Sequence, residues 1–366
     1  MAFQRPFLTS LAALPLTFAA CSSSSSGEPK PVGPHYQYVT NQLDVPTSND
    51  EARADGLDLD GNGQPDNQLG MVLATLGGMG FDIQGTVDVA VLEGEVIFLV
   101  DFQTQDFMNT TAAGIQVFLG QNPMPVACNS GETATCGTCS NSATTKCESD
   151  SDCTSPGTCT MAKPPVCTGC GHQLTGSASF TVDPNGPTNA ALSGKIVAGT
   201  FTGGPGDLSL PLTLAGVNLQ LDLIGARAKC SGITATAIGT ATADGCILGG
   251  ALTQDELDNQ VLPAIQTALV PLIQRDCCGL STSPGGATCN PSATPACGCT
   301  SGSTGSTILG LFDTMPKDCT VSLQEIEMNS LIESLLAPDV TIEGKMALSL
   351  GIKITTVGAT FTSPAN

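Results

Sequence analysis

The sequence predicts an α+β fold that is mainly antiparallel β, either a sandwich or a partly open barrel, with about three amphipathic helices and two disulfide-rich excursions. Three observations lead to this prediction. Apolar residues alternate with polar or small ones over several segments, as in strands that bury one face. The chain contains 42 Gly and 24 Pro, which implies many turns. Its 17 cysteines gather in clusters.

The clearest strand pattern is a predicted β-hairpin. Leucine occupies every second position from Leu208 to Leu214, and apolar residues alternate again from Val217 to Leu223. The Ala215-Gly216 pair between these runs predicts the turn. Further strands are expected at residues 87–92, 95–102, 114–120, 176–183, 195–204 and within 345–363.

Three segments show the apolar spacing of amphipathic helices, at residues 67–76, 253–276 and 322–337. The second and third open with Thr or Ser followed three residues later by Glu. This pattern predicts a capping box, in which two side chains satisfy free N–H groups at the helix start. Pro263 and Pro271 are expected to bend the second helix.

Residues 1–20 are predicted to be a lipoprotein signal peptide. They hold one basic residue, Arg5, and an apolar run too short to span a bilayer. The small residues before Cys21 resemble the bacterial lipoprotein signal, although Phe18 stands where leucine is usual. That resemblance implies acylation of Cys21 and anchoring through its acyl chains. Ser22 in the next position resembles the outer-membrane sorting pattern, so we expect a cell-envelope protein that is anchored in the outer membrane, periplasmic or surface-exposed; plain secretion is the alternative.

The domain boundaries follow from composition. Residues 21–44 are interpreted as the lipidated cysteine and a flexible tether, because Ser22–Pro34 is rich in Ser, Pro and Gly and has no apolar periodicity. Residues 45–366 are interpreted as a single β-rich domain. Cysteine-rich insertions at 128–170 and 277–319 interrupt it, and both are expected to lack core residues and to depend on disulfides.

Sixteen cysteines remain when Cys21 is set aside, and they divide into clusters of even size. In an oxidising compartment this predicts eight disulfides, one of which joins Cys230 to Cys246. Pairing within the two larger clusters stays open. Zinc is the alternative at the Cys-x-x-Cys units of residues 136–139 and 167–170, but three cysteines separate these units and no histidine pattern accompanies them.

Residues 58–67, DLDGNGQPDN, predict a calcium (Ca2+) site. In an EF-hand frame Asp58, Asp60 and Asn62 occupy positions 1, 3 and 5, and they are followed by Gln64 as the carbonyl at position 7 and by Asp66 at position 9. Oxygen ligands at alternate positions can surround one hard cation. A second stretch, residues 314–325, resembles an EF-hand only faintly.

Two departures argue against a paired EF-hand. Leu69 replaces the bidentate carboxylate of position 12, and Pro65 lacks the N–H that pairs two such loops. The stretch is more similar to the solitary Asp-rich loops of dockerins or thrombospondin type 3 repeats, with water or Asp55 completing the ligands. The alternative is a Gly-rich turn in which Asp66 caps the following helix.

Composition excludes several functions. The net charge of −21 repels nucleic acid, and 4% aromatic residues with no Trp leave few stacking platforms. The two histidines form no readable catalytic arrangement, and the chain has no GxSxG, HExxH or P-loop motif.

Together, the signal, the Asp-rich loop, the cysteine-rich stretches and CTVSLQEIEMNSLIESLLAPDV (319–340) resemble uncharacterised predicted lipoproteins of myxobacterial type. The resemblance implies a class and no activity. We therefore expect a non-enzymatic, calcium-stabilised, disulfide-rich surface or outer-membrane lipoprotein that binds or scaffolds an unknown protein or apolar ligand. The alternative is a lipid or apolar-ligand carrier built from the leucine-rich hairpin and the long helix. A hydrolase that uses paired carboxylates is the third hypothesis.

Overall fold

The structure is a computed structural model of the chain. It describes residues 29–78, 83–121, 137–147, 154–161, 171–184, 186, 190–214, 217–239, 245–278, 292, 296–314 and 316–362. The predicted signal peptide and Cys21 lie outside these residues. Their processing and acylation stay predictions.

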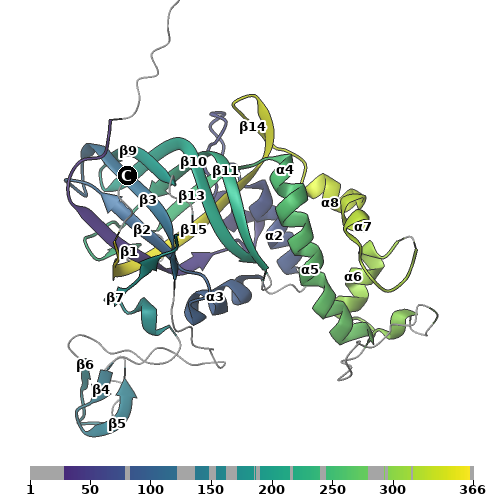
Figure 1. Cartoon of the computed structure of the whole chain (residues 1–366), viewed down its shortest axis with the longest axis horizontal. Helices are drawn as coiled ribbons and strands as arrows, with labels where there is room; N and C mark the ends of the chain where they lie inside the picture. Colours follow the sequence, from purple (N-terminus) through teal and green to yellow (C-terminus); the bar gives the residue numbers. More distant parts are fainter. Residues whose placement is uncertain are drawn as a thin grey trace, which may run out of the picture.

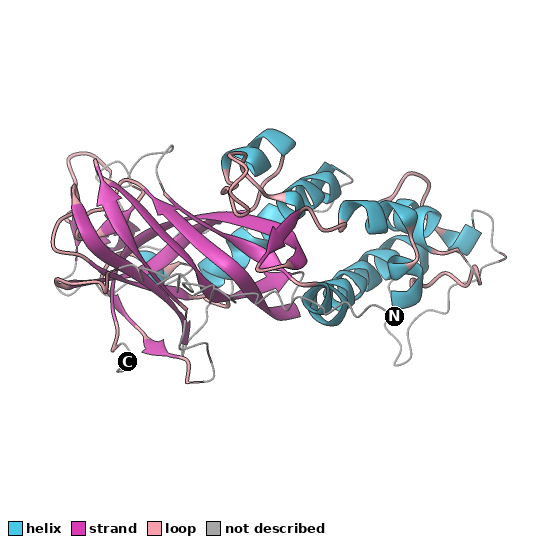
Figure 2. Cartoon of the chain, turned by 90° about the horizontal axis from the view of Figure 1, so that it is seen from above, coloured by secondary structure: helices cyan, strands magenta, loops and turns pink. Residues whose placement is uncertain are grey.

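Eight antiparallel strands form a closed barrel (Figures 1 and 2). In order around the barrel they are β1 (His35–Asp44), β2 (Phe98–Gln103), β3 (Thr110–Gln121), β9 (Ala191–Val197), β10 (Thr200–Leu214), β11 (Val217–Cys230), β13 (Cys246–Leu252) and β15 (Lys345–Thr360). The barrel closes because β15 also pairs with β1. The prediction of a mainly antiparallel β fold is confirmed, and a closed barrel replaces the sandwich or partly open barrel. The expectation of about three helices is wrong, because the described residues form more helices than that.

The first strand corrects the expected boundary of the tether. The sequence places residues 21–44 in a flexible segment, but His35–Asp44 forms β1 and pairs with both β2 and β15. Tyr38, Val39 and Leu43 are fully buried. The strand is hard to recognise because polar residues separate these apolar ones, and because its partner β15 lies far away in sequence.

The expected strand at residues 87–92 is instead part of a helix, α3 (Ile83–Glu93). Val87, Ala90 and Val91 are buried, which is the three-to-four-residue spacing of a helix face, whereas Val89 is 45% exposed. Valines at every second position also fit a strand, and the segment is too short for its periodicity to separate the two structures.

The predicted hairpin is confirmed. Strands β10 and β11 pair from Leu214 with Val217 back to Phe201 with Cys230. The predicted disulfide between Cys230 and Cys246 is also present, and it joins directly opposed residues of β11 and β13. Among the described residues between these cysteines, β12 (Ala237–Ile238) pairs with β15, and Ile233 forms an antiparallel bridge with Ile238.

The barrel interior is packed with apolar side chains. Phe102 and Phe201, both fully buried, meet edge to face with ring centroids 5.1 Å apart. The gap between Phe98, Val117 and Ile352 has no room for a water molecule. Burial of apolar surface inside the barrel therefore stabilises the fold, at about 25 cal/mol for each Å² removed from water.

Helices cover one end of the barrel (Figure 2). The long predicted helix is present as one continuous helical segment: α4 (Gln254–Glu256), the π-helical η3 (Leu257–Val261), α5 (Leu262–Ile273) and the π-helical η4 (Gln274–Cys278). At its start Thr253 accepts from the Glu256 N–H, but Glu256 itself accepts from the backbone N–H of Asp222 in β11. The Glu half of the expected capping box is thus replaced by a contact with the barrel.

The third predicted helix is divided in two, α7 (Leu323–Glu327) and α8 (Ser330–Leu335). The capping box of Ser322 and Glu325 is confirmed. The division occurs at Asn329, whose side-chain oxygen accepts from the N–H groups of Leu331 and Ile332 and so starts a new helix.

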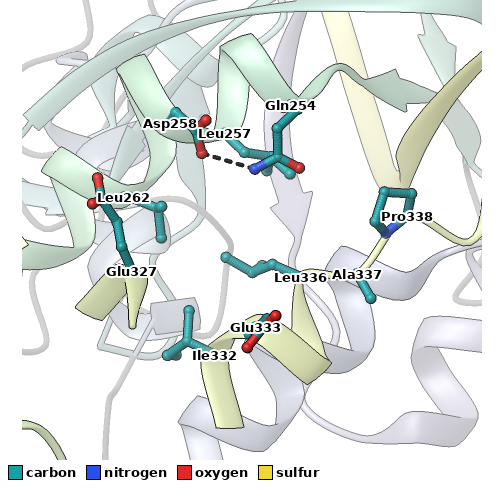
Figure 3. Close-up of a pocket in the computed structure, with 10 residues that line it drawn as sticks. All are labelled: Gln254, Leu257, Asp258, Leu262, Glu327, Ile332, Glu333, Leu336, Ala337 and Pro338. Atoms are coloured by element: carbon teal, nitrogen blue, oxygen red, sulfur yellow. Dashed lines mark hydrogen bonds between the residues drawn. The ribbon is translucent and has the colours of Figure 1, made fainter. Parts of the chain in front are cut away.

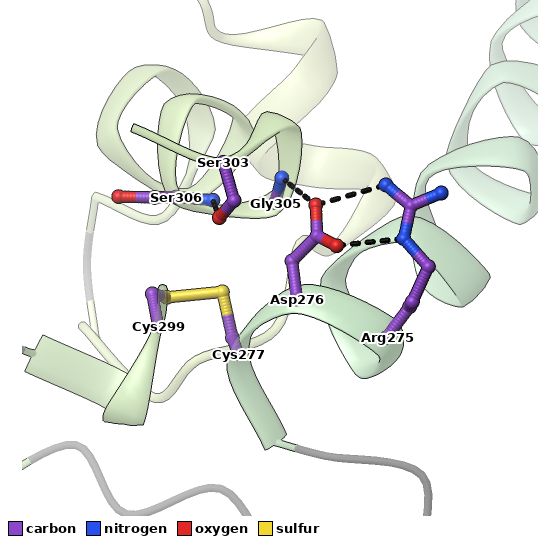
Figure 4. Close-up of polar contacts among 7 residues, drawn as sticks. All are labelled: Arg275, Asp276, Cys277, Cys299, Ser303, Gly305 and Ser306. Atoms are coloured by element: carbon purple, nitrogen blue, oxygen red, sulfur yellow. Dashed lines mark hydrogen bonds and ion pairs between the residues drawn. A yellow bond between two sulfur atoms is a disulfide. The ribbon is translucent and has the colours of Figure 1, made fainter. Parts of the chain in front are cut away.

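The cysteine-rich stretch at 277–319 does carry core residues, contrary to expectation. It contains α6 (Thr304–Phe312), which buries Ile308, Leu309 and Phe312. The disulfide Cys277–Cys299 holds this stretch to the end of the long helix, and the disulfide Cys297–Cys319 joins two parts of the stretch itself. Figure 4 shows the adjoining polar contacts, in which Asp276 accepts from the Gly305 N–H at 2.8 Å and from Arg275 Nε at 2.6 Å.

The other cysteine-rich stretch contributes a small separate sheet of β4 (Gly137–Cys139), β5 (Ser142–Cys147) and β6 (Cys159–Met161). The pairing of its cysteines lies outside the described side chains. The remaining elements are α1 (Asn49–Ala54), α2 (Gln68–Gly78), η2 (His172–Leu174), β7 (Ala178–Ser179), β8 (Thr181–Val182), η5 (Ala296–Gly298) and β14 (Val340–Ile342). Among the described residues no helix combines the length and apolar character needed to cross a membrane.

Candidate metal centre

The Asp-rich stretch forms a loop between α1 and α2, which we call the calcium loop (residues 57–67). Its two arms are joined by an antiparallel bridge in which the Asp66 N–H donates to the Leu57 carbonyl at 2.9 Å. Leu59 is 3% exposed and packs in a cluster with Ala251 of β13 and Val340 of β14. The base of the loop is therefore fixed against the outside of the barrel.

Three carboxylates converge in this loop. One oxygen from each of Asp58, Asp60 and Asp66 lies within 4.8 Å of the other two. Asp58 accepts from the N–H groups of Gly61 and Gly63 at 2.7 and 3.0 Å. Both glycines have a positive φ, near 82°, which lets the chain turn back sharply enough to bring the carboxylates together.

Among the residues that the structure describes, no ion pair with a basic side chain balances the charges of this cluster. None of the ion pairs among the described residues involves Asp58, Asp60 or Asp66. The pKa of Asp66 is raised, chiefly because partial burial disfavours its charged form, and the nearby Asp60 also raises it. A bound cation would remove this repulsion.

The structure places the two remaining predicted ligands beside the cluster. Asn62 donates from Nδ2 to Asp60 at 3.1 Å, while its amide oxygen accepts from the Gln64 N–H at 2.7 Å. Both residues are exposed. Carboxylate, amide and backbone oxygens are the ligands that calcium prefers, and solvent can complete a set of six to eight.

Asp55 does not join the cluster. It lies beside Asp44, Glu51 and Lys353, and the pKa of Asp55 is raised to about 6, mainly by burial and further by the two acids, while Lys353 lowers it. The conformation of the loop thus separates this carboxylate from the three that converge.

The residue that sequence reasoning missed is Asn67. Its buried side chain donates from Nδ2 to the carbonyls of Ala52 and Gly351, each at 2.9 Å, and accepts through Oδ1 from the N–H groups of Gly351 at 2.8 Å and Gly70 at 3.0 Å. Asn67, and not Asp66, therefore caps α2. The one available signal was an Asn directly before an apolar-periodic run.

At Gly351, the backbone of β15 comes close to the segment just before the calcium loop. A Cβ at Gly351 would lie 2.2 Å from the Asp55 carbonyl oxygen, so this approach requires glycine.

The next residue extends this connection to the helices. The Gln68 N–H donates to Ser349 Oγ at 2.7 Å, and Gln68 Nε2 donates to the Leu335 carbonyl of α8 at 3.1 Å. Ser349 in turn donates its N–H to Asp339 at 2.8 Å. The calcium loop is thus linked by hydrogen bonds to β15 and α8.

A groove of about 390 Å³ lies between the long helix and α7–α8 (Figure 3). It is lined by apolar side chains, among them Leu257, Ile332 and Leu336, and by the acidic Asp258, Glu327 and Glu333. The carboxylates are exposed, whereas the apolar residues are almost fully buried. A groove of this size can hold a few side chains or a small ligand.

Comparisons of the chain with protein-family models, with curated proteins and with solved structures find no match. The interpretation of the site therefore depends on its geometry. That geometry concentrates three negative charges on one small volume and holds them there through a rigid base. It is suited to retaining a divalent cation.

Proposed function

We propose that this protein is a non-enzymatic, calcium-stabilised, disulfide-rich lipoprotein of the cell surface or outer membrane, with a binding or scaffolding role. The observation that carries the proposal is the convergence of Asp58, Asp60 and Asp66 within 4.8 Å. Asn62 and the Gln64 carbonyl are the proposed further ligands. Calcium is favoured over softer metals because every candidate ligand is an oxygen.

Calcium has a structural role in this proposal. The ion neutralises carboxylates that otherwise repel one another, and so stabilises the loop whose base holds α2 and β15 together. A ligand that binds only the folded state stabilises it by about 2.7 kcal/mol at a concentration one hundred times its Kd. The solitary loop with a neutral Asn62 and no bidentate Glu suits the weak affinities of extracellular modules, about 0.1 to 1 mM.

The proposed location outside the cytoplasm is supported by the three disulfides among the described residues, since such bonds persist in oxidising compartments. In the proposal the acyl chains of Cys21 hold the protein at the membrane. Because β1 begins at His35, the connection between anchor and barrel is shorter than composition alone suggested. The partner, a protein or an apolar ligand, is bound by the barrel and its helices.

A second candidate function is the carriage of an apolar ligand. Leu221 and Leu223 of the hairpin and Leu257 of the long helix are almost fully buried in one core cluster, so these side chains do not carry the proposal. The groove lined by Leu257, Ile332 and Leu336 favours this function instead, with acidic side chains that suit a ligand carrying a positive charge. A lipid-sized mass that co-purifies with the protein would support it.

Native mass spectrometry of the chain carrying Cys21→Ser tests the first candidate. In calcium we expect an EGTA-removable increment of about 38 Da, because one calcium displaces two protons. Asp58→Ala or Asp60→Ala should abolish the increment. Asp318→Ala, which removes an exposed carboxylate from a different loop, is the matched control and should retain it. An increment that is absent, or that survives Asp58→Ala, would refute the calcium site.

A further inference from the structure

The end of the barrel opposite the helices has an unusual surface, which we call the tip and define by Val32, Met108, Val197 and the lysines Lys30, Lys195 and Lys229. Val32 is 42% exposed, and Met108 and Val197 are each 57% exposed. These are three of the few large apolar side chains that the described part of the chain leaves exposed. At the helical end the exposed surface near the groove is acidic instead.

The apolar side chains of the tip are held on paired backbone segments. The Gly199 N–H donates to the Met108 carbonyl at 2.9 Å, and the Val32 N–H donates to Ala112 of β3 at 3.2 Å. Ala198 and Gly199 both have positive φ, which forms the tight two-residue turn between β9 and β10. The apolar residues therefore project from fixed positions, and they need no ordering when they meet a partner.

Aromatic residues support this surface. Tyr36, one of only two tyrosines in the chain, packs on Phe107 with ring centroids 4.6 Å apart. Both side chains are partly exposed. Aromatic rings with one polar and one apolar side are typical of the boundary between water and lipid.

Positive charge exceeds negative charge at the tip, where three lysines stand against Asp106, whose carboxylate accepts from the Met108 N–H at 2.7 Å, although the chain as a whole is strongly acidic. Lys195 lies on the same outward face of β9 as Val197, and Thr202 pairs with Lys195 on one side and with Lys229 on the other. Strand spacing places the two lysines about 10 Å apart. Lys30 is also exposed. Only 12 residues of the chain are Lys or Arg against 33 Asp or Glu, so this grouping opposes the overall charge.

We propose that the tip docks on a membrane surface rich in anionic lipids, with the apolar side chains among the headgroups and the lysines on lipid phosphates. The position of the anchor favours lipid over a protein partner, and this step depends on the proposed acylation of Cys21. Eight residues lie between Cys21 and Lys30, a span of at most about 30 Å, which keeps the tip within that distance of the bilayer. The tip is thus the part of the barrel that meets the membrane.

The absence of Trp from the chain allows a direct test. Met108→Trp in the chain carrying Cys21→Ser places a single Trp at the tip. The fluorescence emission maximum of this Trp should shift to shorter wavelength when vesicles containing phosphatidylglycerol are added. The shift should be much smaller with vesicles of phosphatidylcholine alone. Met346→Trp, at a side chain that is 67% exposed near the opposite end of the barrel, is the matched control and should not shift.

Sedimentation with the same vesicles, using the chain without an introduced Trp, tests how much the lysines of the tip contribute to vesicle binding. Lys195→Glu with Lys229→Glu should weaken binding at least about tenfold, because each lysine near an anionic surface contributes about 1 kcal/mol.

Three outcomes would overturn the proposal: no shift of the Trp emission, an equal shift in both Trp variants, or equal binding to phosphatidylcholine. A shift that grows with protein concentration without vesicles would identify a second copy of the chain as the occupant, and would also overturn it. Neither assay uses the acyl chain or calcium, so failure here is distinguishable from failure of the proposed function.

Discussion

Two acidic loops of this protein bring ligand-type atoms together in different ways. In the calcium loop three carboxylate oxygens lie within 4.8 Å of one another, and in a second loop the same distance holds for Cys297, Asp313 and Cys319. In the second loop, however, both sulfurs belong to a disulfide. Its buried Asp313 carboxylate accepts from the N–H groups of Asp318 and Cys319 at 3.1 and 3.0 Å.

The comparison shows that proximity of ligand atoms does not by itself indicate a metal site. The second loop, which we call the disulfide loop (residues 312–325), is tied to Cys297 of η5 by the disulfide of Cys319, and its one converging charge is matched by backbone donors. The calcium loop has three charges and no basic partner among the described ion pairs. The unbalanced charge, more than the spacing, is what a cation would satisfy.

The largest expected effect concerns the base of the calcium loop. Asn67→Ala should lower the free energy of unfolding by about 4 kcal/mol, because four buried backbone groups lose their partner. Urea denaturation measures the loss. Asn329→Ala, which removes the cap of α8 and the hydrogen bond from Nδ2 to the Leu311 carbonyl, is the matched control and should cost about 2 kcal/mol. Equal losses would contradict the assigned role of Asn67.

The disulfide loop can be opened independently. Replacing Cys297 and Cys319 by Ala should destabilise the fold by about 3 kcal/mol, since the bond closes a loop of 22 residues. Calcium affinity, measured by titration calorimetry, should stay unchanged. A weaker calcium affinity would mean that the two loops are energetically coupled, which would contradict their independence.

Calcium affinity should fall as the solution becomes acidic. Ligands must be ionised to bind the metal, and the pKa of Asp66 is raised by burial, so protons compete with calcium above the usual range of an Asp. We expect weaker calcium binding, that is, a higher Kd, at pH 5 than at pH 7.5. Calorimetric titrations at the two pH values test this, and an unchanged Kd would show that Asp66 is not a ligand.

The smallest effect is predicted for Asp55, next to the calcium loop. Because its pKa in the folded protein is about 6 against an ordinary value of 3.8, folding favours the protonated form. That contribution is fully present below pH 3.8 and is lost as the pH rises through 6. Asp55→Asn should therefore stabilise the protein by about 1 kcal/mol at pH 7.5, after allowance for solvent screening of a half-exposed group, and by nothing at pH 3.5. Denaturation curves at both pH values decide this.

What the sequence could predict was local. The hairpin from Leu208 to Leu223 follows from alternation, and the calcium loop follows from five ligand positions within nine residues. Asn67 could not be found in the same way, because Gly351, which it contacts, is 284 residues distant along the chain.

The errors have physical causes of the same kind. The sequence places β1 in the tether because the burial of this strand depends on β15 and β2, and neither strand is adjacent to it in sequence. The valines of α3 alternate over a stretch too short to separate strand from helix, and only contact with the barrel decides between them. Closure of the barrel likewise depends on a pairing between distant strands, which no local pattern encodes.

That pairing has a consequence for biogenesis. Gln37 of β1 donates from Nε2 to the Phe361 carbonyl at 2.6 Å, across 324 residues of chain. Until β15 has been synthesised, the edge of β1 that pairs with it has bare N–H and C=O groups that could pair with another chain. In the proposed lipoprotein, acylation of Cys21 before export of β15 would hold this unpaired edge of β1 at the membrane. Assembly of the barrel is then a late event that joins the first and last strands, and any truncation before residue 345 leaves it open.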